Sequence, residues 1–215
     1  MSPVLPSGPL LSAFLLASLV LAITPGPGVI YIVTRSAVHG RRSGLASVAG
    51  VALGNLGNAW GAALGLAALF ALSALAFAVV KYAGALYLVY LGVQALHAPR
   101  GDERAAEPDA APLGAIFRDG FVIALLNPKT ALFFAAFLPQ FVGDAPGAMQ
   151  RSVSLGALFV AIAAVTDTGY ALLAGAVAPA LADNGAMRAA GRRVGGGALI
   201  GLGVLAALSG SRSAR

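Results

Sequence analysis

The chain has 215 residues, of which 59% are hydrophobic and only 10% are charged, whereas a soluble domain carries about a quarter charged residues. This composition excludes a soluble enzyme and predicts an integral membrane protein, and the net charge of +6 is typical of basic cytoplasmic loops rather than of nucleic-acid binding. The absence of cysteine excludes disulfides and thiolate metal sites, and the two histidines, His39 and His97, lie beside polar loops, where we expect no metal site.

Six apolar stretches follow one another along the chain. They cover about residues 9–34, 43–72, 74–96, 115–138, 153–181 and 194–209. Each approaches or exceeds the roughly 18 residues of a transmembrane candidate, and six spans of roughly 20 residues would use about 120 residues. The sequence therefore predicts an all-α polytopic membrane protein with six transmembrane helices in a single domain, residues 1–215.

The first stretch does not resemble a cleaved signal peptide. A secretory signal has basic residues before its apolar segment, whereas here the first positive charges, Arg35, Arg41 and Arg42, follow it. We therefore expect residues 9–34 to remain as the first helix.

The basic residues predict the orientation in the membrane. The loops after the first, third and fifth stretches hold nine of the fourteen Lys and Arg residues, and the opposite side holds four. The nine are Arg35, Arg41, Arg42, Arg100, Arg104, Arg118, Arg188, Arg192 and Arg193. By the positive-inside rule these loops are cytoplasmic, so both termini are expected on the periplasmic side of a bacterial inner membrane.

Residues 97–119 form the longest hydrophilic stretch and combine mixed charges with proline and alanine, which is typical of a flexible linker. A regulatory loop is the alternative interpretation. The cytoplasmic linker, about residues 97–114, divides the domain into repeat one, about 9–96, and repeat two, about 115–209.

Short sequence matches relate the two halves. Pro25 and Pro128 lie 103 residues apart in similar local sequences, and Trp60 and Tyr170 lie 110 residues apart. Because each half holds three helices, an odd number, the second copy would cross the membrane in the opposite direction. Such inverted repeats recur in secondary transporters, whose substrate site lies between the repeats near the bilayer midplane. The matches therefore predict two inverted three-helix repeats with a central site.

The first apolar stretch is interrupted by Thr24, Pro25, Gly26, Pro27 and Gly28. Two prolines remove backbone donors and clash with preceding carbonyls, so the helix is expected to break here. Within a membrane a break is tolerated where protein or a water-filled cavity satisfies the freed groups, and the exposed helix ends attract charged groups of a substrate. We expect substrate binding at these residues, and a structural kink is the alternative.

Asn127, Pro128 and Lys129 form a matching break in the fourth stretch. A lysine between two apolar runs is costly to bury without a partner or a cavity. Lys129 could hold a substrate carboxylate, pair with Asp167, or change protonation during transport, and snorkelling to the interface is the alternative. Asp167 is the one acid well inside a predicted span, so it is the candidate for ion coupling; a static ion pair is the alternative.

Asn55 and Asn58 lie three residues apart and therefore share one face of the second helix. That placement fits a substrate-binding site, and it fits hydrogen bonds between helices equally well.

Four motifs stand out when the chain is taken as a whole. They are Thr24 to Pro27, Gly40 to Gly44, Lys81 to Gly92, and Asn127 to Lys129 followed by Pro139, Gln140 and Phe141. Together they resemble the lysine exporter / homoserine–threonine resistance (LysE/RhtB) family, and the last combination is the most specific. The resemblance runs from about residue 10 to residue 208.

The resemblance implies a six-helix inner-membrane exporter of amino acids or close derivatives, driven by the proton gradient and homodimeric. Position by position, it gives importance to Pro25, Gly26, Pro27, Asn127, Pro128 and Lys129. Members often carry an acid in the fifth helix, where Asp167 lies.

The leading hypothesis is thus a secondary exporter of neutral amino acids, of homoserine- or threonine-like molecules, or of homoserine lactone. Its expected partners are the substrate, protons and the lipid bilayer, with no nucleic acid, no cofactor and no catalytic residue. The chain has no phosphate-binding loop motif, so ATP drive is not encoded in it. A non-transporting assembly or sensory subunit and an intramembrane enzyme are the alternatives, although the spans lack the histidines, cysteines and paired acids that an enzyme would need.

Overall fold

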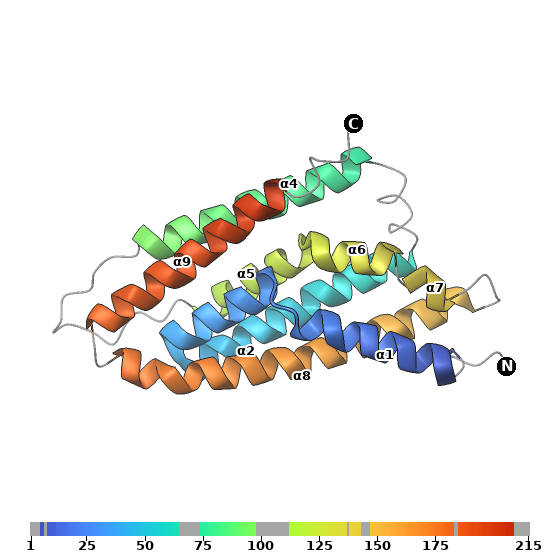
Figure 1. The fold of residues 1–215 in the computed structure, drawn as a ribbon, viewed down its shortest axis with the longest axis horizontal. Helices are drawn as coiled ribbons and strands as arrows, with labels where there is room; N and C mark the ends of the chain where they lie inside the picture. The colour runs from blue at the N-terminus through green and yellow to red at the C-terminus, as the bar shows by residue number, and fades with distance from the viewer. Residues whose placement is uncertain are drawn as a thin grey trace.

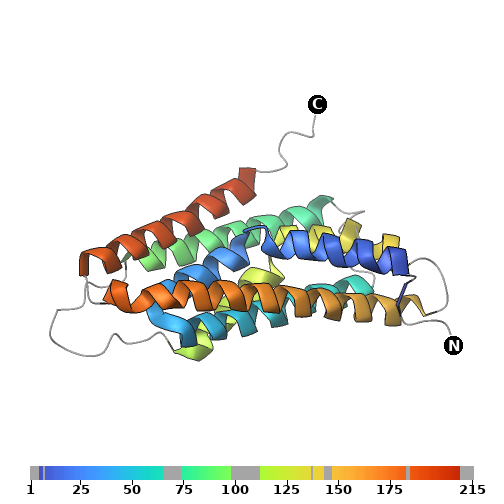
Figure 2. The ribbon, with the colours of Figure 1, turned by 60° about the horizontal axis from the view of Figure 1, so that its bottom comes forward.

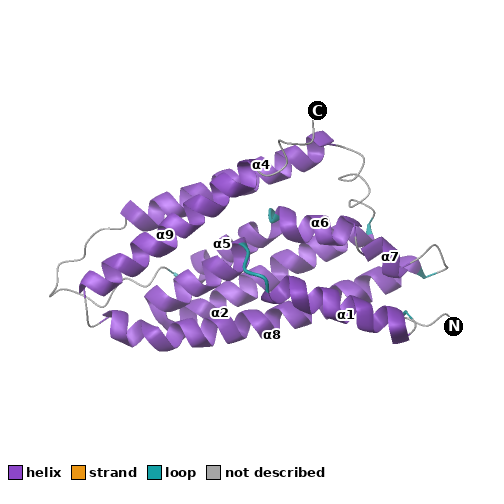
Figure 3. Ribbon diagram, in the orientation of Figure 1, coloured by secondary structure: helices purple, strands orange, loops and turns teal. Residues whose placement is uncertain are grey.

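The computed structural model describes residues 5–6, 8–64, 74–97, 112–136, 138–142, 147–182 and 185–208. Over these residues the chain forms eight helices and no strand (Figure 3). The helices are α1 (Gly8–Ile23), α2 (Pro27–Ala63), α4 (Ala74–His97), α5 (Leu113–Leu125), α6 (Pro128–Ala136), α7 (Leu138–Val142), α8 (Ala148–Ala182) and α9 (Gly185–Leu208). The prediction of an all-helical protein is confirmed for the described part of the chain.

Helix α2 contains a sharp change of direction. Its backbone leaves helical geometry at Gly40, where φ is +81° and ψ is 179°, a combination that residues with a Cβ rarely adopt. Figure 1 shows the chain turning back at this point. Gly44 consequently packs against Ser36 across the turn, where an added Cβ would collide with the serine hydroxyl. The part of α2 before Gly40 therefore continues from α1, and the part after it returns along the bundle.

The stretch predicted as one helix over residues 115–138 is divided into α5, α6 and α7. The first interruption falls at Leu126 and Asn127, directly before Pro128. This proline cannot donate a backbone hydrogen bond to the preceding turn, so the helix ends and a new one begins at the proline, where the missing donor costs nothing.

The structure also corrects the end of the hydrophilic stretch, which overlapped the predicted helix over residues 115–138. The hydrophilic stretch was expected to reach Asp119, but this residue belongs to α5 and is only 6% exposed. Asp119 and Asp167 are both buried acids within the described helices. The sequence contained a signal for the helical placement of Asp119. Ile116, Asp119 and Ile123 recur at helical spacing and share one buried face of α5.

Among the described residues, one segment, Ala148–Val177 of α8, is long and apolar enough to cross a bilayer by itself. A second candidate is the pair α1 and α2 taken as one broken span, bent by 48° at the break. The count of six spans stays a prediction.

Helix packing brings the two halves of the chain together. The α2 helix packs most extensively against α8 and α5, and α4 packs against α9 (Figures 1 and 2). The second pair approaches closely because Gly92 of α4 faces Gly196 of α9, where an added Cβ on either residue would press on the opposite backbone carbonyl. Such close packing through small residues is typical of helices within membranes.

An aromatic cluster fills the core between α1, α6, α7 and α8. Its members are Phe14, Phe133, Phe134, Phe141 and Phe159. Phe14 meets Phe141 edge-on with the ring centroids 5.3 Å apart, and Phe134 meets Phe159 edge-on at 5.1 Å. Edge-to-face pairs of this kind stabilise the packing beyond the apolar area they bury. The cluster fixes one wall of the cavity described below, because Phe159 also lines that cavity.

Candidate functional site

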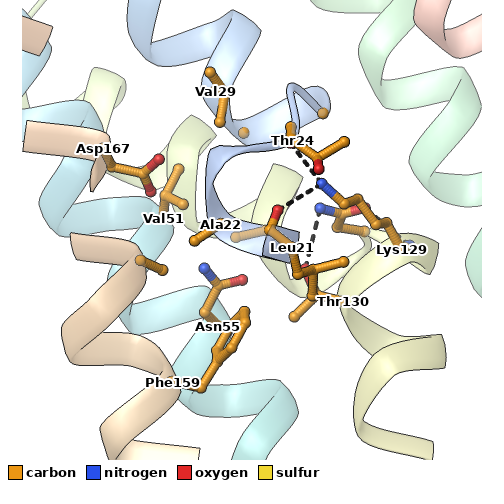
Figure 4. Close-up of a pocket in the computed structure, with 15 residues that line it drawn as sticks. Leu21, Ala22, Thr24, Val29, Val51, Asn55, Lys129, Thr130, Phe159 and Asp167 are labelled. Atoms are coloured by element: carbon orange, nitrogen blue, oxygen red, sulfur yellow. Dashed lines mark hydrogen bonds between the residues drawn. The ribbon is translucent and has the colours of Figure 1, made fainter. Parts of the chain in front are cut away.

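The two helix breaks lie side by side, although they are about a hundred residues apart in the sequence (Figure 4). Lys129, in the first turn of α6, extends its side chain to the end of α1. Its ammonium group donates hydrogen bonds to the carbonyl oxygens of Leu21, at 2.9 Å, and Thr24, at 2.6 Å. A cation at the carboxyl end of a helix also interacts favourably with the helix dipole. These hydrogen bonds of Lys129 therefore connect the α5–α6 break to the break between α1 and α2.

Side chains also donate hydrogen bonds to two further carbonyl groups near the end of α1. The Thr24 hydroxyl donates to the carbonyl oxygen of Val20 at 2.6 Å. The Tyr170 hydroxyl, from α8, donates to the carbonyl oxygen of Ile23 at 2.9 Å. Unpaired carbonyls at a helix end are expensive away from water, and these bonds explain how a broken helix persists inside an apolar bundle.

Asn127 caps the start of α6. Its side-chain oxygen accepts a hydrogen bond from the backbone N–H of Lys129 at 3.0 Å, and its amide nitrogen donates to the hydroxyl of Thr130 at 3.2 Å. This is the geometry that makes asparagine a favoured residue at helix starts. The cap directs the first turn of α6, and with it Lys129, toward the end of α1.

The start of α2 lacks such a cap. Gly26 precedes Pro27 with an extended backbone (φ −145°, ψ −174°) and has no side chain to accept the free N–H groups of the first turn. A Cβ on Gly26 would lie 3.3 Å from Cδ of Lys129 and 3.5 Å from its ammonium nitrogen. The glycine therefore leaves room for the lysine and leaves a helix start with unfilled hydrogen-bonding capacity.

A cavity of about 40 Å3 lies where the breaks meet, between the end of α1, both parts of α2, the α5–α6 break and α8 (Figure 4). Seven of the residues singled out in the sequence line it: Thr24, Gly26, Gly28, Asn55, Asn127, Lys129 and Asp167. Four others, Pro25, Pro27, Pro128 and Asn58, do not line it, although the three prolines belong to the breaks that shape it. Its volume is enough for a few water molecules, so an amino acid requires it to open.

Lys129 and Asp167 occupy opposite walls of the cavity (Figure 4). The two side chains do not form an ion pair, because the ammonium group of Lys129 binds the carbonyls of α1 instead. Asp167 is 5% exposed and has no hydrogen bond or salt bridge to the described residues. The static ion pair considered from the sequence is therefore absent, and the cavity has one cationic and one anionic wall.

The two asparagines of α2 have different environments. Asn58 is half-buried and donates its amide N–H to the carbonyl oxygen of Ala124 at 2.8 Å, near the end of α5. Asn55 lines the cavity and is 6% exposed, and its side-chain oxygen is buried with no hydrogen-bond partner. Asn58 thus joins two helices, whereas Asn55 offers an unused acceptor to the cavity.

Several cavity residues carried no chemical signal in the sequence. They are Val51, Ala124, Thr130, Phe159 and Ala163. Helical spacing could have found two of them, because Phe159, Ala163 and Asp167 recur at steps of four along one face of α8.

A second polar network, which the sequence did not indicate, lies where α2, α4 and α5 meet. Asp119 accepts a hydrogen bond from the Tyr87 hydroxyl at 3.0 Å and forms salt bridges with Arg118, at 3.3 Å, and Arg35, at 3.9 Å. The Arg35 guanidinium also lies 5.3 Å from the ring centroid of Tyr31. Tyr31 is fully buried and donates its hydroxyl to the carbonyl oxygen of Ile116 at 3.0 Å, which ties α2 to α5.

Broken helices that meet at a small polar cavity are an arrangement found in secondary membrane transporters. The comparisons with known proteins agree. The family model for the LysE type translocator matches residues 19–210. The chain is 36% identical over 166 residues to the homoserine/homoserine lactone efflux protein of Salmonella typhimurium, covering 77% of this chain and 81% of that protein. It is 33% identical over 130 residues to the leucine efflux protein of Salmonella choleraesuis, covering 60% of this chain and 61% of that protein. No solved structure matches the chain.

The chain belongs to the LysE type translocator family. It is therefore an amino-acid efflux transporter of the membrane rather than an enzyme, which confirms the family and the function class implied by the motifs.

Proposed function

We propose that this protein exports neutral, zwitterionic amino acids across the bacterial cytoplasmic membrane by alternating access, in exchange for protons. One observation carries the proposal: the cavity at the two helix breaks has Lys129 on one wall and Asp167 on the other (Figure 4). A zwitterion carries the complementary pair of charges, and a cavity with one charge of each sign matches a substrate of zero net charge. Homoserine and leucine, named for the relatives, are zwitterions and are the first candidates; homoserine lactone, also named for a relative, has the ammonium group without a free carboxylate.

The eight helices are consistent with six spans arranged as two inverted repeats. On this proposal α1 and the first part of α2 form one broken span, and the second part of α2, then α4, complete the first repeat. The second repeat consists of α5 with α6 and α7 as its broken span, then α8 and α9. Both broken spans resume at a proline, Pro27 in one and Pro128 in the other, and these residues correspond better than the pair Pro25 and Pro128 chosen from the sequence.

Two packed regions flank the cavity, and on this proposal they are the two closures that alternating access requires. One turn of α5 away from the cavity, Tyr31 packs against Gly120. The neighbouring residue, Asp119, accepts a hydrogen bond from Tyr87 and forms a salt bridge with Arg35. On the other side the aromatic cluster packs beneath Phe159. On this proposal each closure opens in turn when the repeats move against each other, and a homodimer is the expected assembly.

The proposal is tested by counterflow in proteoliposomes loaded with homoserine, homoserine lactone, leucine, threonine or lysine, with and without an imposed pH gradient. We expect saturable exchange of the net-neutral amino acids that exceeds lysine exchange by about tenfold or more, since a second positive charge has no partner in the cavity. Acceleration by the pH gradient is expected for a proton-coupled carrier. Folded protein that exchanges none of the panel would contradict the proposal.

The orientation is tested separately by labelling single cysteines, for which the chain has no background thiol. The basic end of the bundle includes Arg35, Arg41 and Arg118, brought together by contacts of α2 with α5 and α8. On the proposal this end is cytoplasmic and both termini are periplasmic. A membrane-impermeant maleimide added to intact cells should therefore label Arg151→Cys and should not label Arg41→Cys. The reverse pattern would show the opposite orientation.

A further inference from the structure

Two residues with acceptor groups, Asn55 and Asp167, line the cavity from neighbouring helices. Asn55 of α2 is 6% exposed, and its side-chain oxygen is enclosed without a hydrogen-bond partner. Asp167 of α8 is 5% exposed, and its carboxylate makes no hydrogen bond or salt bridge within the described part of the chain. A buried acceptor without a donor costs free energy, so such groups are retained where a ligand or water supplies the donor.

The other polar side chains around the cavity are already bonded. Asn127 binds Thr130 and the backbone of Lys129, and Lys129 itself binds two carbonyls of α1. On the α2–α8 side of the cavity, the acceptors available to a ligand are therefore the Asn55 amide oxygen and the Asp167 carboxylate. A group with several N–H donors and a positive charge satisfies both acceptors at once, and an ammonium group has three such donors.

The opposite side of the cavity suits a carboxylate. The first turn of α2 has no side-chain cap, and its residues Gly28 and Val29 line the cavity. Lys129 lies across the cavity from Asp167, and Val29, at the start of α2, lies between the two in this view (Figure 4). A helix start with free N–H groups attracts anions, and the lysine adds its charge to that attraction.

From this distribution we infer that Asn55, together with Asp167, binds the α-ammonium group of the exported amino acid, so that Asn55 is a determinant of substrate specificity. The inference rests on the proposed function, because it assigns an orientation to that substrate. Asn55 supplies an acceptor without a second negative charge, so the cavity keeps its charge balance while it holds the ammonium group from two helices.

Three related probes separate the two ends of the substrate. Homoserine has both charged groups, homoserine lactone has the ammonium group without a free carboxylate, and N-acetylhomoserine has the carboxylate without the ammonium group. Binding of each probe to purified protein in detergent is measured by thermal shift, and inhibition of homoserine counterflow is measured in proteoliposomes. The binding readout stays informative whether or not the protein transports the probe.

The variant Asn55→Leu keeps the approximate size of the side chain and removes the acceptor. We expect it to weaken the binding of homoserine and of homoserine lactone by about tenfold or more, since a hydrogen bond to a charged group is lost, and to leave N-acetylhomoserine unchanged. Asn55→Asp keeps an acceptor and removes the amide donor, so it should retain binding of the lactone. This second variant decides the question where the leucine variant does not fold.

Asn58→Leu is the matched control, with the same change one turn along the same helix. It should lower the melting temperature, because the carbonyl of Ala124 loses its donor, and it should leave the ratio of lactone to N-acetylhomoserine binding unchanged. The inference is overturned if folded Asn55→Leu binds the lactone like the wild type, or if it loses N-acetylhomoserine instead. Lactone binding that is lost in Asn55→Leu, in a protein without counterflow, would support the ammonium site and contradict the proposed function.

Discussion

Replacing Lys129 with methionine is expected to reduce export by about tenfold or more while most of the protein still inserts in the membrane. Methionine is similar in length but cannot donate hydrogen bonds, so the carbonyls of Leu21 and Thr24 lose their charged donor. Each such bond contributes about 1.5–3 kcal/mol, and the cavity also loses its cationic wall. Export is measured as counterflow, and stability is measured as the melting temperature in detergent.

The structure changes what this variant is expected to do. The sequence left open whether Lys129 holds a substrate carboxylate, pairs with Asp167 or changes protonation during transport. Because the lysine also joins α6 to the end of α1, we expect a lower melting temperature as well. The matched variant Lys129→Arg keeps the positive charge and donors and should retain part of the stability. Wild-type export and unchanged substrate affinity in Lys129→Met would contradict both roles.

Replacing Asp119 with asparagine is expected to lower the free energy of unfolding by about 2 kcal/mol. Its side chain is 8% exposed and that of Arg35 is 17% exposed, so the substitution leaves a poorly solvated guanidinium without its counter-ion. Removal of one partner of a buried ion pair destabilises strongly because the other charge stays in place. Unfolding in mixed detergent micelles, monitored by circular dichroism, provides the measurement.

Two neighbouring variants separate the parts of this network. Tyr87→Phe removes only the hydroxyl that donates to Asp119 and should cost about 1 kcal/mol. Arg118→Ala removes a side chain that is 71% exposed, and exposed ion pairs contribute little, so its stability should change by less than about 0.5 kcal/mol. If Asp119→Asn is as stable as Arg118→Ala, the buried network does not hold α2, α4 and α5 together.

Much of the site could be predicted from local sequence. Proline and glycine restrict or free the backbone wherever they occur, so the breaks at Thr24 to Gly28 and at Asn127 to Lys129 followed directly from residue type. An intramembrane Lys129 and Asp167 were recognisable because a charge in an apolar stretch is costly anywhere. These signals need no knowledge of neighbours.

Partners across helices could not be predicted in the same way. Whether Lys129 binds Asp167 or the carbonyls of α1 depends on which atoms lie within about 3 Å, and spacing along the chain does not contain that distance. The same holds for Asp119, whose arginine and tyrosine partners come from three helices.

The sequence by itself determined the helical class, the family and the two breaks, because apolar stretches, prolines and family motifs are properties of single segments. The tertiary structure alone decided that the breaks meet at one cavity and that Asn58 joins two helices, whereas Asn55 keeps a free acceptor. The physical reason is that both asparagines have the same intrinsic chemistry and share one helix face. They differ only in which backbone groups the packing of α2 against α5 and α8 brings within reach.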